Sequence, residues 1–539
     1  MKWRSNRTDA DWQRDCMLSG FNLTHLIPWA FRVWRNREYI IYRDQRLTRA
    51  QVWDNLNALS AGLQALGARK GDRIATLLPA RPEAIYSIFL PNRIRTVNVP
   101  LNPFWRESEL RHVLADAGAK IVITQKEWFG QDYPAMLAHI LHELPALKYV
   151  IVCDEISRFA RNDNNNFLPY ARVAIPGRAP RAIPARMDDL ILLAYTSGTT
   201  GKPKGIAHSS ATMWGMPLTQ NLGHLFHSPL RCLLLPFAPY QYAGIFGAAV
   251  TLFAGGKIVL MDRFEPRRAL ELIAHERATQ VGLSPTMARL MLSVPEQTRF
   301  DLSSVQRITF STEPCPRDLA EALRARFNCH LQNFYGTTES MMIAWTTPDD
   351  PWERAATTVG KPVPGARVRI VDDARRAVPL GQPGEIAVQT KQMMIGYYND
   401  PALTAQVLDR DGWYYTGDIG VLGADGFLRV VDRKKDLIIR GGQNIFPAEI
   451  EVYLQTHPAI RRAAVIGVPD AISGESVCAY IETIPGARLT ATNVLDFCRG
   501  QIAPYKIPEQ VFFVERLPVT GSNKVEKYKL RELARTANL

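Results

Sequence analysis

Residues 195–205 form a short segment in which three glycines, three threonines, one serine and two lysines lie close together. Glycines let backbone N–H groups turn inward, hydroxyls add hydrogen-bond donors, and lysines add positive charge. An apolar run over residues 190–194 comes before it and predicts a buried strand. It is not a Walker A motif, because Gly198 and Gly201 are too close and Pro203 stands where that motif has a hydroxyl residue. We expect a loop that holds a polyphosphate; the alternative is a flexible surface loop.

Residues 333–340 carry an aromatic ring, a glycine, hydroxyl groups and a carboxylate, and they follow a strand-like run at residues 329–332. Tyr335 can stack on adenine, Thr338 can bond a phosphate oxygen, and Glu339 can hold Mg²⁺ through its carboxylate. These residue types favour a nucleotide site. The alternative is a turn with a solvated glutamate.

Residues 413–418 end in Asp418, which directly follows a glycine. A carboxylate can accept hydrogen bonds from two ribose hydroxyls at once, although a lone aspartate in a turn is usually structural. The charged run at residues 432–436 is typical of a solvated turn, and it also stands where a small C-terminal unit begins.

In this order along the chain, the segments resemble the motifs of the adenylate-forming superfamily: acyl-CoA synthetases, aryl-acid ligases, adenylation domains of peptide synthetases and beetle luciferases. The resemblance extends from Leu47 to Leu530. It implies an α/β fold with a large N-terminal domain over residues 1–431, made of parallel-rich sheets flanked by helices plus a distorted β-barrel part. It also implies a hinge at residues 432–436 and a small mobile α+β lid domain at residues 437–539.

The resemblance also implies a nucleotide site. In it Tyr335 stacks on adenine, and Asp418 and Arg433 grip the ribose. Glu313 departs from the small residues that the family usually has at its position. The implied nucleotide-binding residues are Thr196, Ser197, Gly198, Thr199, Thr200, Lys204, Thr312, Glu313, Pro314, Tyr335, Gly336, Thr337, Thr338, Asp418, Arg433 and Lys524.

The implied catalytic residues are Thr338 at the α-phosphate, Glu339 and Lys524, with Glu339 and Thr196 as metal ligands. A lysine near the α-phosphate stabilises the negative charge of phosphoryl transfer. Lys524 follows a Leu–Pro pair at the family's spacing, although Asn523 replaces the glycine that usually comes before this lysine.

The family catalyses two reactions in one site. The resemblance implies that the residues after residue 432 move the small domain between the first and the second reaction. The acid first attacks the α-phosphate of ATP, and a thiol then attacks the acyl-AMP after the small domain has turned about Lys435. Arg440, Gly441 and Gly442 would line the thiol tunnel, because glycines let a thin pantetheine arm pass close to the backbone. Gln443 stands where many relatives have glutamate.

Residues 235–244 lie where the family binds its acid, and here Pro239 takes the place of the histidine that the family often has. Amino-acid adenylation domains hold the α-amino group with an aspartate in this region, and this segment has none, so a non-amino organic acid is expected. Aromatic and medium-length acyl groups both fit. The expected acyl pocket is apolar with a few polar points and comprises Tyr240, Gln241, Tyr242, Phe334 and Met341.

The sequence therefore predicts an ATP-dependent carboxylic acid–CoA ligase that uses ATP, Mg²⁺ and CoA. The alternative acceptor is a carrier-protein pantetheine, loaded by a stand-alone adenylating enzyme. Luciferase-type oxidation uses the same scaffold. A nucleotide-binding protein without catalysis is a different class; Asn523 and the missing histidine favour it, whereas Lys524, Glu339 and Asp418 argue against it.

The elements that must position these residues alternate between helices and strands, which predicts largely parallel sheets. Thr48 is expected to cap a helix whose apolar residues recur every three or four positions until Gly67. Asp425 and Gly426 predict a hairpin turn, after which a small α+β unit begins. Strands are expected at 73–78, 121–124, 150–153, 233–235, 257–260, 307–310, 463–468 and 477–481, and helices after Pro82, at 107–117, after Pro447 and at 492–498.

Composition places the chain among globular proteins: 539 residues, 46% hydrophobic and 22% charged. The net charge of +13 favours acidic partners, but the basic residues are dispersed, so nucleic acid is not expected. Seven scattered cysteines, the lack of an N-terminal apolar run and the lack of a long apolar stretch predict a cytoplasmic protein without integral membrane association.

Overall fold

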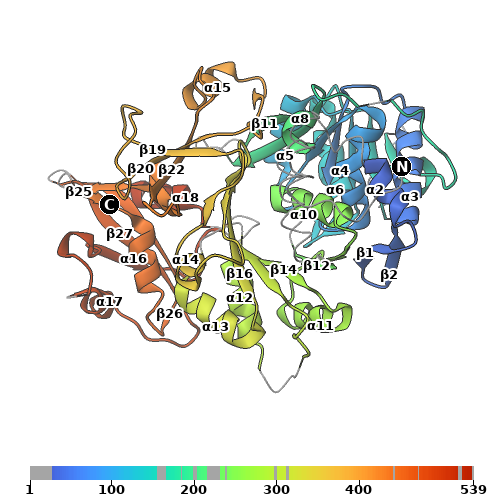
Figure 1. Ribbon diagram of the computed structural model, residues 1–539. Coiled ribbons are helices and arrows are strands. Elements are labelled where there is room, and N and C mark those ends of the chain that lie inside the picture. Colours follow the sequence, from blue (N-terminus) through green and yellow to red (C-terminus); the bar gives the residue numbers. More distant parts are fainter. Residues whose placement is uncertain are drawn as a thin grey trace. The chain divides into compact units, whose positions relative to one another are not determined.

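The computed structural model describes residues 27–154, 166–183, 185–197, 203–214, 231–236, 239–295, 300–310, 315–440, 443–470, 473–499, 501–519 and 525–536 (Figure 1). The chain divides into two compact units. Unit 1 comprises residues 1–367 and 388–414, and unit 2 comprises residues 368–387 and 415–539.

A nine-stranded, mainly parallel sheet forms one half of unit 1. The ladders from β1 through β13, β12, β14 and β15 to β16 are parallel, and antiparallel strands close both edges. The strand order is β18 (Lys361–Pro362), β17 (Met341–Trp345), β16 (His330–Thr337), β15 (Arg307–Phe310), β14 (Gln280–Leu283), β12 (Cys232–Leu235), β13 (Lys257–Leu260), β1 (Glu38–Tyr42) and β2 (Gln45–Thr48).

An eight-stranded sheet forms the other half of unit 1 and contains an antiparallel hairpin near one edge. That hairpin, β10 and β11, brackets the expected phosphate loop. Strand pairing therefore extends into both ends of the segment 195–205 that the sequence predicted as loop. The strand order is β21 (Gly396–Tyr397), β11 (Pro203–Ser209), β10 (Leu190–Ser197), β4 (Val97–Pro100), β3 (Arg73–Leu77), β5 (Ile121–Thr124), β8 (Tyr149–Val152) and β9 (Phe167–Pro169).

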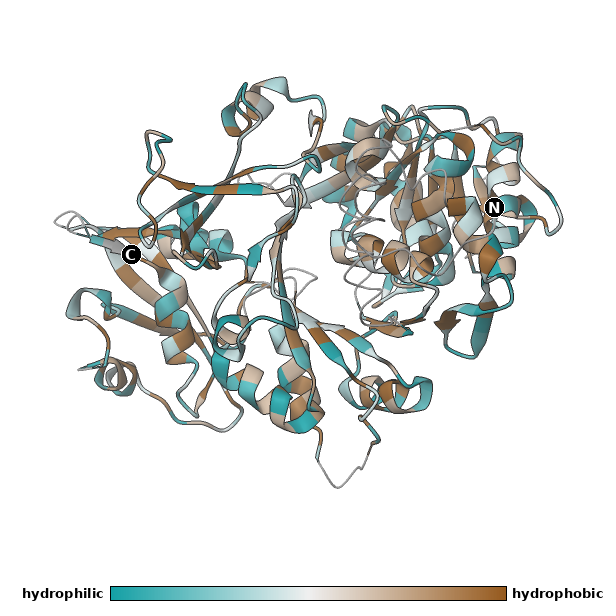
Figure 2. Cartoon of the chain, viewed as in Figure 1, coloured by the Kyte–Doolittle hydropathy of each residue, from teal (hydrophilic) through white to brown (hydrophobic). Residues whose placement is uncertain are grey.

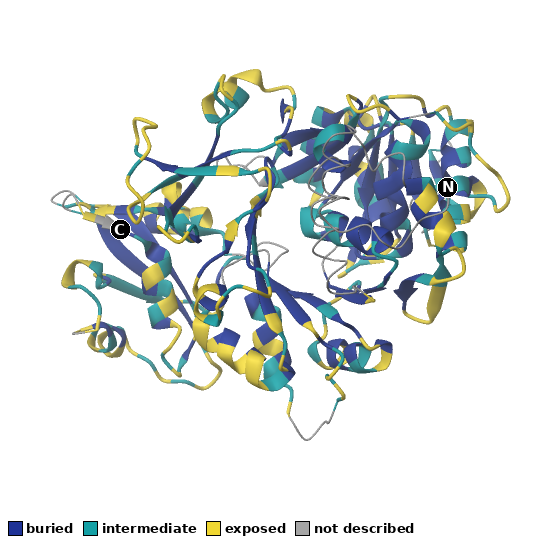
Figure 3. Cartoon of the chain, in the orientation of Figure 1, coloured by how far each residue is buried: buried dark blue, intermediate teal, exposed yellow. Residues whose placement is uncertain are grey.

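Successive residues of the central strands pack into different cores, as the two-residue period of a strand requires. Ile121 and Ile123 join a core with the helices α3 (Arg49–Ala65), α4 (Pro82–Ile94) and α10 (Tyr242–Phe253). Val122 instead joins a core with α5 (Glu107–Ala117) and α6 (Tyr133–Ile140). Leu233 and Leu235 of β12 also join the first core, so one helical layer is shared by the two sheets. The strands of unit 1 are largely apolar in Figure 2 and largely buried in Figure 3.

Because side chains alternate along a strand, the opposite face of β12 packs against a third set of helices. Its Leu234 joins a core with α11 (Pro266–Glu276), α12 (Pro285–Leu292) and α13 (Arg317–Phe327). Each sheet of unit 1 is therefore covered by helices on both faces. This confirms the predicted α/β class.

Helix α3 begins as its sequence predicts. The Thr48 side chain accepts a hydrogen bond from the N–H of Gln51, and the Gln51 side chain accepts one from the N–H of Thr48. This capping box satisfies two of the N–H groups that a helix start leaves unpaired. The apolar positions Val52, Leu56 and Leu59 are fully buried.

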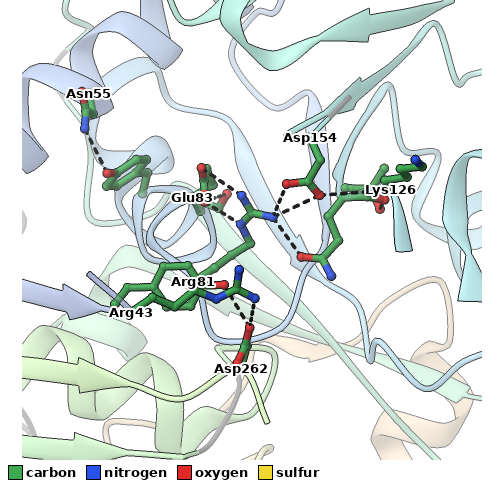
Figure 4. Close-up of polar contacts among 12 residues, drawn as sticks. Arg43, Asn55, Arg81, Glu83, Lys126, Asp154 and Asp262 are labelled. Carbon is green, nitrogen blue, oxygen red and sulfur yellow. Dashed lines mark hydrogen bonds and ion pairs between the residues drawn. The ribbon is translucent and has the colours of Figure 1, made fainter. Parts of the chain in front are cut away.

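A polar network fixes the start of α4 against the ends of two strands (Figure 4). The Arg81 guanidinium donates to Glu83 Oε2 at 2.7 Å, to Gln125 Oε1 at 2.9 Å and to Asp154 Oδ1 at 3.2 Å. Gln125 and Asp154 follow β5 and β8, so one arginine joins a helix start to two strand ends.

Unit 2 contains a four-stranded sheet and a small α+β lobe. The sheet order is β19 (Arg367–Val371), β20 (Pro383–Gln389), β22 (Tyr414–Leu422) and β23 (Leu428–Arg433), and Gly426 takes φ +81° in the predicted hairpin. The lobe has a sheet of β25 (Gln443–Ile445), β24 (Ile438–Arg440), β27 (Gly474–Thr483), β26 (Ile460–Asp470) and β28 (Gln510–Phe513), with the helices α16 (Pro447–Leu454), α17 (Ala491–Cys498) and α18 (Lys527–Thr536).

The division by contacts runs elsewhere than the predicted domain boundary. Residues 368–387 and 415–431, which the sequence prediction assigned to the large domain, pack with unit 2. A hinge at residues 432–436 concerns movement rather than packing, so the division into residues 1–431, 432–436 and 437–539 stays a prediction. Among the described residues, no helix is both long and apolar enough to cross a membrane.

Candidate active site

Helix α5 holds both ends of the phosphate-loop hairpin. At the end of β10, the Tyr195 hydroxyl donates to Asp116 Oδ2 at 2.6 Å. At the start of β11, His112 Nε2 lies 2.9 Å from the carbonyl oxygen of Pro203. Both partners lie on α5, so a single helix fixes the two points between which the loop must span.

The hairpin register places two predicted nucleotide-binding residues, Thr196 and Lys204, on opposite strands at the same level. Thr196 pairs with Lys204, and Tyr195 pairs with Gly205. A Cβ at Gly205 would lie 2.9 Å from the Tyr195 ring, so the glycine makes room for that ring. Thr196 is half-buried. Of the other predicted loop residues, Gly198, Thr199, Thr200 and the side chain of Ser197 lie outside the described part of the structure.

Glu339 and Lys204 meet at a third residue, Tyr397. The Tyr397 hydroxyl donates to Glu339 Oε1 at 2.8 Å, and Lys204 Nζ donates to the Tyr397 oxygen at 2.6 Å. The direct separation between Lys204 Nζ and Glu339 Oε1 is longer, at 3.5 Å. The Glu339 side chain is only 11% exposed. The structure thus brings the predicted metal carboxylate and a predicted nucleotide lysine together.

Tyr397 is a residue of this site that sequence reasoning missed. Its strand, β21, has two residues and pairs with β11 at Ile206. The glycine before it, Gly396, was the available signal, since a glycine within a strand often marks a close approach of chains. Burial, together with the neighbouring Glu339 carboxylate, raises the pKa of Tyr397 far above its usual value, so the phenol keeps its proton.

A buried neutral histidine supports the backbone beside Glu339. His208 Nε2 lies 2.7 Å from the carbonyl oxygen of Thr338, and Nδ1 lies 3.1 Å from Thr212 Oγ1. Burial lowers the pKa of His208 to about 4, so the imidazole is neutral near pH 7. Since a carbonyl only accepts, Nε2 carries the proton and donates it.

The segment from Tyr335 to Ser340 is strand and tight turn. Tyr335 and Gly336 lie in β16, whose partner strand β17 starts at Met341. A Cβ at Gly336 would lie 2.0 Å from the Met341 carbonyl oxygen, so only glycine fits there. Thr337 Oγ1 lies 2.9 Å from Ser340 Oγ and closes the turn that carries Thr338 and Glu339.

In unit 2 the predicted ribose residues lie side by side. Asp418 of β22 pairs in register with Arg433 of β23, and Arg433 Nε lies 2.6 Å from Asp418 Oδ1. Asp418 is buried, whereas Arg433 is exposed. The buried carboxylate can accept hydrogen bonds from sugar hydroxyls, and the exposed guanidinium can donate to them.

The predicted hinge is surrounded by paired charges. Asp432 Oδ2 accepts from the N–H of Ala448 at 2.9 Å, and Lys434 Nζ lies 2.9 Å from Glu385 Oε2. Arg531 lies 2.8 Å from Asp436 Oδ1. Lys435, the predicted pivot, is exposed.

The described edge of the predicted thiol tunnel is held within unit 2. Arg440 donates to the carbonyl oxygen of Tyr505 at 3.0 Å and pairs with Glu509. Gly441 and Gly442 lie outside the described residues, as do Thr312, Glu313, Pro314 and Lys524.

The expected acyl-pocket residues divide between two apolar clusters. Met341 belongs to the large core between the sheets, and Tyr242 and Phe246 pack against this core with ring centroids 5.6 Å apart. Phe334 packs against a smaller cluster of Met342, Trp345 and Val363, which Phe246 also contacts. Tyr240 accepts from Gln241 Nε2 at 3.3 Å and faces a small cavity lined by Thr76, Leu78, Ala84, Asn98, Pro100 and Pro239.

Known proteins resemble this chain along nearly all of its length. The family model for AMP-binding enzymes matches residues 27–398, and the model for the C-terminal domain of AMP-binding enzymes matches residues 449–524. Feruloyl-CoA synthase of an Amycolatopsis species is 35% identical over 489 residues, which are 90% of this chain and 93% of that protein.

Two further relatives show the same coverage. The human mitochondrial medium-chain acyl-CoA ligase is 31% identical over 525 residues, which are 92% of this chain and 84% of that protein. The crystal structure of an anthranilate CoA ligase with anthranoyl-AMP is 26% identical and has a TM-score of 0.84, and the match covers 96% of this chain and 98% of that one.

Proposed function

The chain belongs to the AMP-binding, adenylate-forming enzyme family and is an acid–thiol ligase of the acyl-CoA synthetase type, and from this premise we propose that it joins a non-amino carboxylic acid to CoA through an acyl-adenylate. One observation carries the proposal: Tyr397 joins Lys204, at the base of the phosphate-loop hairpin, to the carboxylate of Glu339. A phosphate loop and a metal carboxylate in contact are what the adenylation step requires.

We propose Mg²⁺ as the cation that accompanies ATP. The described residues contain no group of three or more His, Cys, Asp or Glu side chains that could bind a metal. Glu339 alone offers a held carboxylate, and Mg²⁺ in nucleotide sites is bound by one or two carboxylates plus phosphate oxygens and water. Glu339 and the Thr196 hydroxyl would hold it. When bound, the cation neutralises charge on the phosphate oxygens.

The chain's own residues then divide the remaining work. Tyr335 would stack on adenine, Asp418 and Arg433 would hold the ribose, and Lys524 would stabilise the charge at the α-phosphate. Under this proposal, Lys524 acts in the adenylation step and not in the thiol step. Lys435 would be the pivot that brings Arg440, Gly441 and Gly442 to the thiol for the second step.

The acid is proposed to be aromatic or medium-chain aliphatic. The paired rings of Tyr242 and Phe246 on α10, and Phe334 on β16, provide apolar surface, and Phe246 and Phe334 pack against the same small cluster. The relatives named for feruloyl, anthranilate and medium-chain acyl substrates cover the same two classes. The alternative acceptor, a carrier-protein pantetheine, shares its thiol arm with CoA and is separated from it by experiment. We also propose a cytoplasmic location, which cell fractionation tests.

Pyrophosphate release over an acid panel tests the proposal. The purified chain is given MgATP with ferulate, benzoate, hexanoate, octanoate or glycine, and then CoA or a holo-carrier protein. We expect release with at least one aryl or medium-chain acid, none with glycine, and thioester formation with CoA. Release with no acid, despite measurable ATP binding, would overturn the proposal. Discharge to the carrier without discharge to CoA would establish the alternative acceptor.

A further inference from the structure

Strand β21 holds Glu339 through two contacts. The N–H of Met394, just before the strand, donates to the Glu339 carbonyl oxygen at 2.7 Å, and the Tyr397 hydroxyl donates to Glu339 Oε1 at 2.8 Å. Backbone and side chain of the same glutamate are therefore fixed by one short segment. Tyr397 engages one carboxylate oxygen, Oε1.

Tyr397 is itself held firmly. Its N–H donates to Thr404 Oγ1 at 2.9 Å, its backbone pairs with Ile206 of β11, and its side chain is almost fully buried. Because its position is set by the sheet, the direction of its hydroxyl can fix the orientation of the Glu339 carboxylate.

The phenol also stands between two opposite charges. Lys204 Nζ lies 2.6 Å from the Tyr397 oxygen and 4.0 Å from the ring centroid, but 3.5 Å from Glu339 Oε1. An ammonium group only donates, so it takes the lone pair of the phenol, and the phenol proton must go to the carboxylate. Without the hydroxyl, the Lys204 ammonium would shorten its 3.5 Å ion pair with Glu339, and the metal cation would then have to compete with it for the carboxylate.

We propose that Tyr397 is a positioning residue for metal binding: it orients the Glu339 carboxylate and keeps the Lys204 ammonium from occupying it, so that the cation of MgATP can bind. The inference rests on the proposed function and gives Tyr397 a role in cation binding that the proposed function leaves open. Tyr397 touches neither the acid nor the thiol in this role. Its loss therefore changes the dependence on the cation and leaves the second reaction unchanged.

The test compares Tyr397→Phe with the matched control Tyr398→Phe in the full chain. Tyr398 is the next residue, and its N–H donates to the Gly205 carbonyl oxygen, a contact that the substitution keeps. Binding of Mn²⁺ is followed by the loss of its free electron paramagnetic resonance signal, with a non-hydrolysable ATP analogue present. We expect Tyr397→Phe to raise the Mn²⁺ concentration at half-saturation about tenfold, the usual cost of a hydrogen bond to a charged group. We expect no shift in Tyr398→Phe.

Kinetics supply the second measurement. The Mg²⁺ concentration for half-maximal pyrophosphate release should rise by the same factor in Tyr397→Phe, with kcat at saturating Mg²⁺ and the KM for the acid within about threefold of wild type. Thioester formation from supplied acyl-AMP should not change. Thr404→Val removes the hydroxyl that accepts from the Tyr397 N–H and should give a smaller shift in the same direction; it replaces Tyr397→Phe if that variant does not fold.

Two results would overturn the inference. One is equal Mn²⁺ binding in wild type and Tyr397→Phe; the other is a fall in kcat that saturating cation does not reverse. If the wild-type chain bound no Mn²⁺ with the ATP analogue and released no pyrophosphate, the proposed function would be wrong, and this inference would be wrong for the same reason. If wild type did both and Tyr397→Phe matched it, only the role of Tyr397 would fail.

Discussion

The Glu339 region of unit 1 and the hinge region of unit 2 treat charge in opposite ways. Around Glu339 the described supports are a phenol, a neutral imidazole and backbone groups, and the Lys204 ammonium lies nearer to the phenol oxygen, at 2.6 Å, than to the carboxylate, at 3.5 Å. Around residues 432–436, acids and bases pair directly, as in Arg433 with Asp418 and Arg531 with Asp436. Neutral supports fix a single geometry, whereas ion pairs near the surface can be exchanged at small cost.

The pairs at the hinge also divide by element. Arg433 and Lys434 bond to residues of the four-stranded sheet, Asp418 and Glu385, whereas Asp436 bonds to α18. The predicted pivot, Lys435, stands between these two groups of contacts. A turn at Lys435 would leave these ion pairs intact on their own sides, but it would break the hydrogen bond from the Ala448 N–H to Asp432.

The variant with the largest expected effect tests whether Lys524 of unit 2 stabilises charge in the adenylation reaction only. Lys524→Ala should lower adenylation about 1,000-fold, because removing one group that stabilises transition-state charge costs that much. Thioester formation from supplied acyl-AMP should stay within about threefold of wild type. Single-turnover measurements of both steps check this. Equal losses would mean that the lysine or its role is wrongly assigned.

The second prediction concerns the paired charges themselves. The Lys527 side chain is only 15% exposed and lies 2.8 Å from Glu451 Oε1; burial lowers the pKa of Lys527, but the charges of Glu451, Asp432 and Asp436 outweigh this and raise it. Lys527→Met should destabilise the protein by about 3 kcal/mol, since the acids lose their partner. Lys529→Met on the same helix removes a half-exposed pair with Glu526 and should cost less than about 1 kcal/mol. Urea unfolding compares the two, and equal costs would refute a special role for the buried pair.

The third prediction tests the neutral support in unit 1. Burial lowers the pKa of His208 to about 4, against about 6.5 in the unfolded chain, so the unfolded state binds the proton first as pH falls. Between pH 7.5 and pH 4.5 this histidine should cost about 2–3 kcal/mol of stability. His208→Gln should lose that much less over the same range. The exposed histidine variant His330→Gln serves as control. An unchanged pH dependence in His208→Gln would show that His208 is not a neutral buried group.

The smallest expected effect lies beyond the hinge. Gly442→Leu should slow thiol attack on acyl-AMP about tenfold, because a side chain there would narrow the predicted path of the pantetheine arm. Adenylation should not change and acts as the internal control. An equal fall in the adenylation rate would show that Gly442 does not line a path used by the thiol alone.

Local signals were sufficient for much of the fold. Thr48 stands directly before the apolar helical pattern, so the N-cap was predictable from the sequence alone. The strands of unit 1 are apolar because both faces are covered, and their positions followed from that pattern. Tyr397 was missed because its importance depends on pairing between strands almost 200 residues apart, β11 and β21. His112 and Asp116 were missed for the same reason, since a helix surface does not reveal which loop it supports.

The pairing of β11 on both of its edges has a practical consequence. Since β10 on one side and β21 on the other set its register, β11 cannot slip by one residue, which would turn Lys204 to the opposite face, without breaking both ladders at once. A substitution that weakens one neighbouring strand therefore leaves the other ladder to keep Lys204 on the side of Glu339.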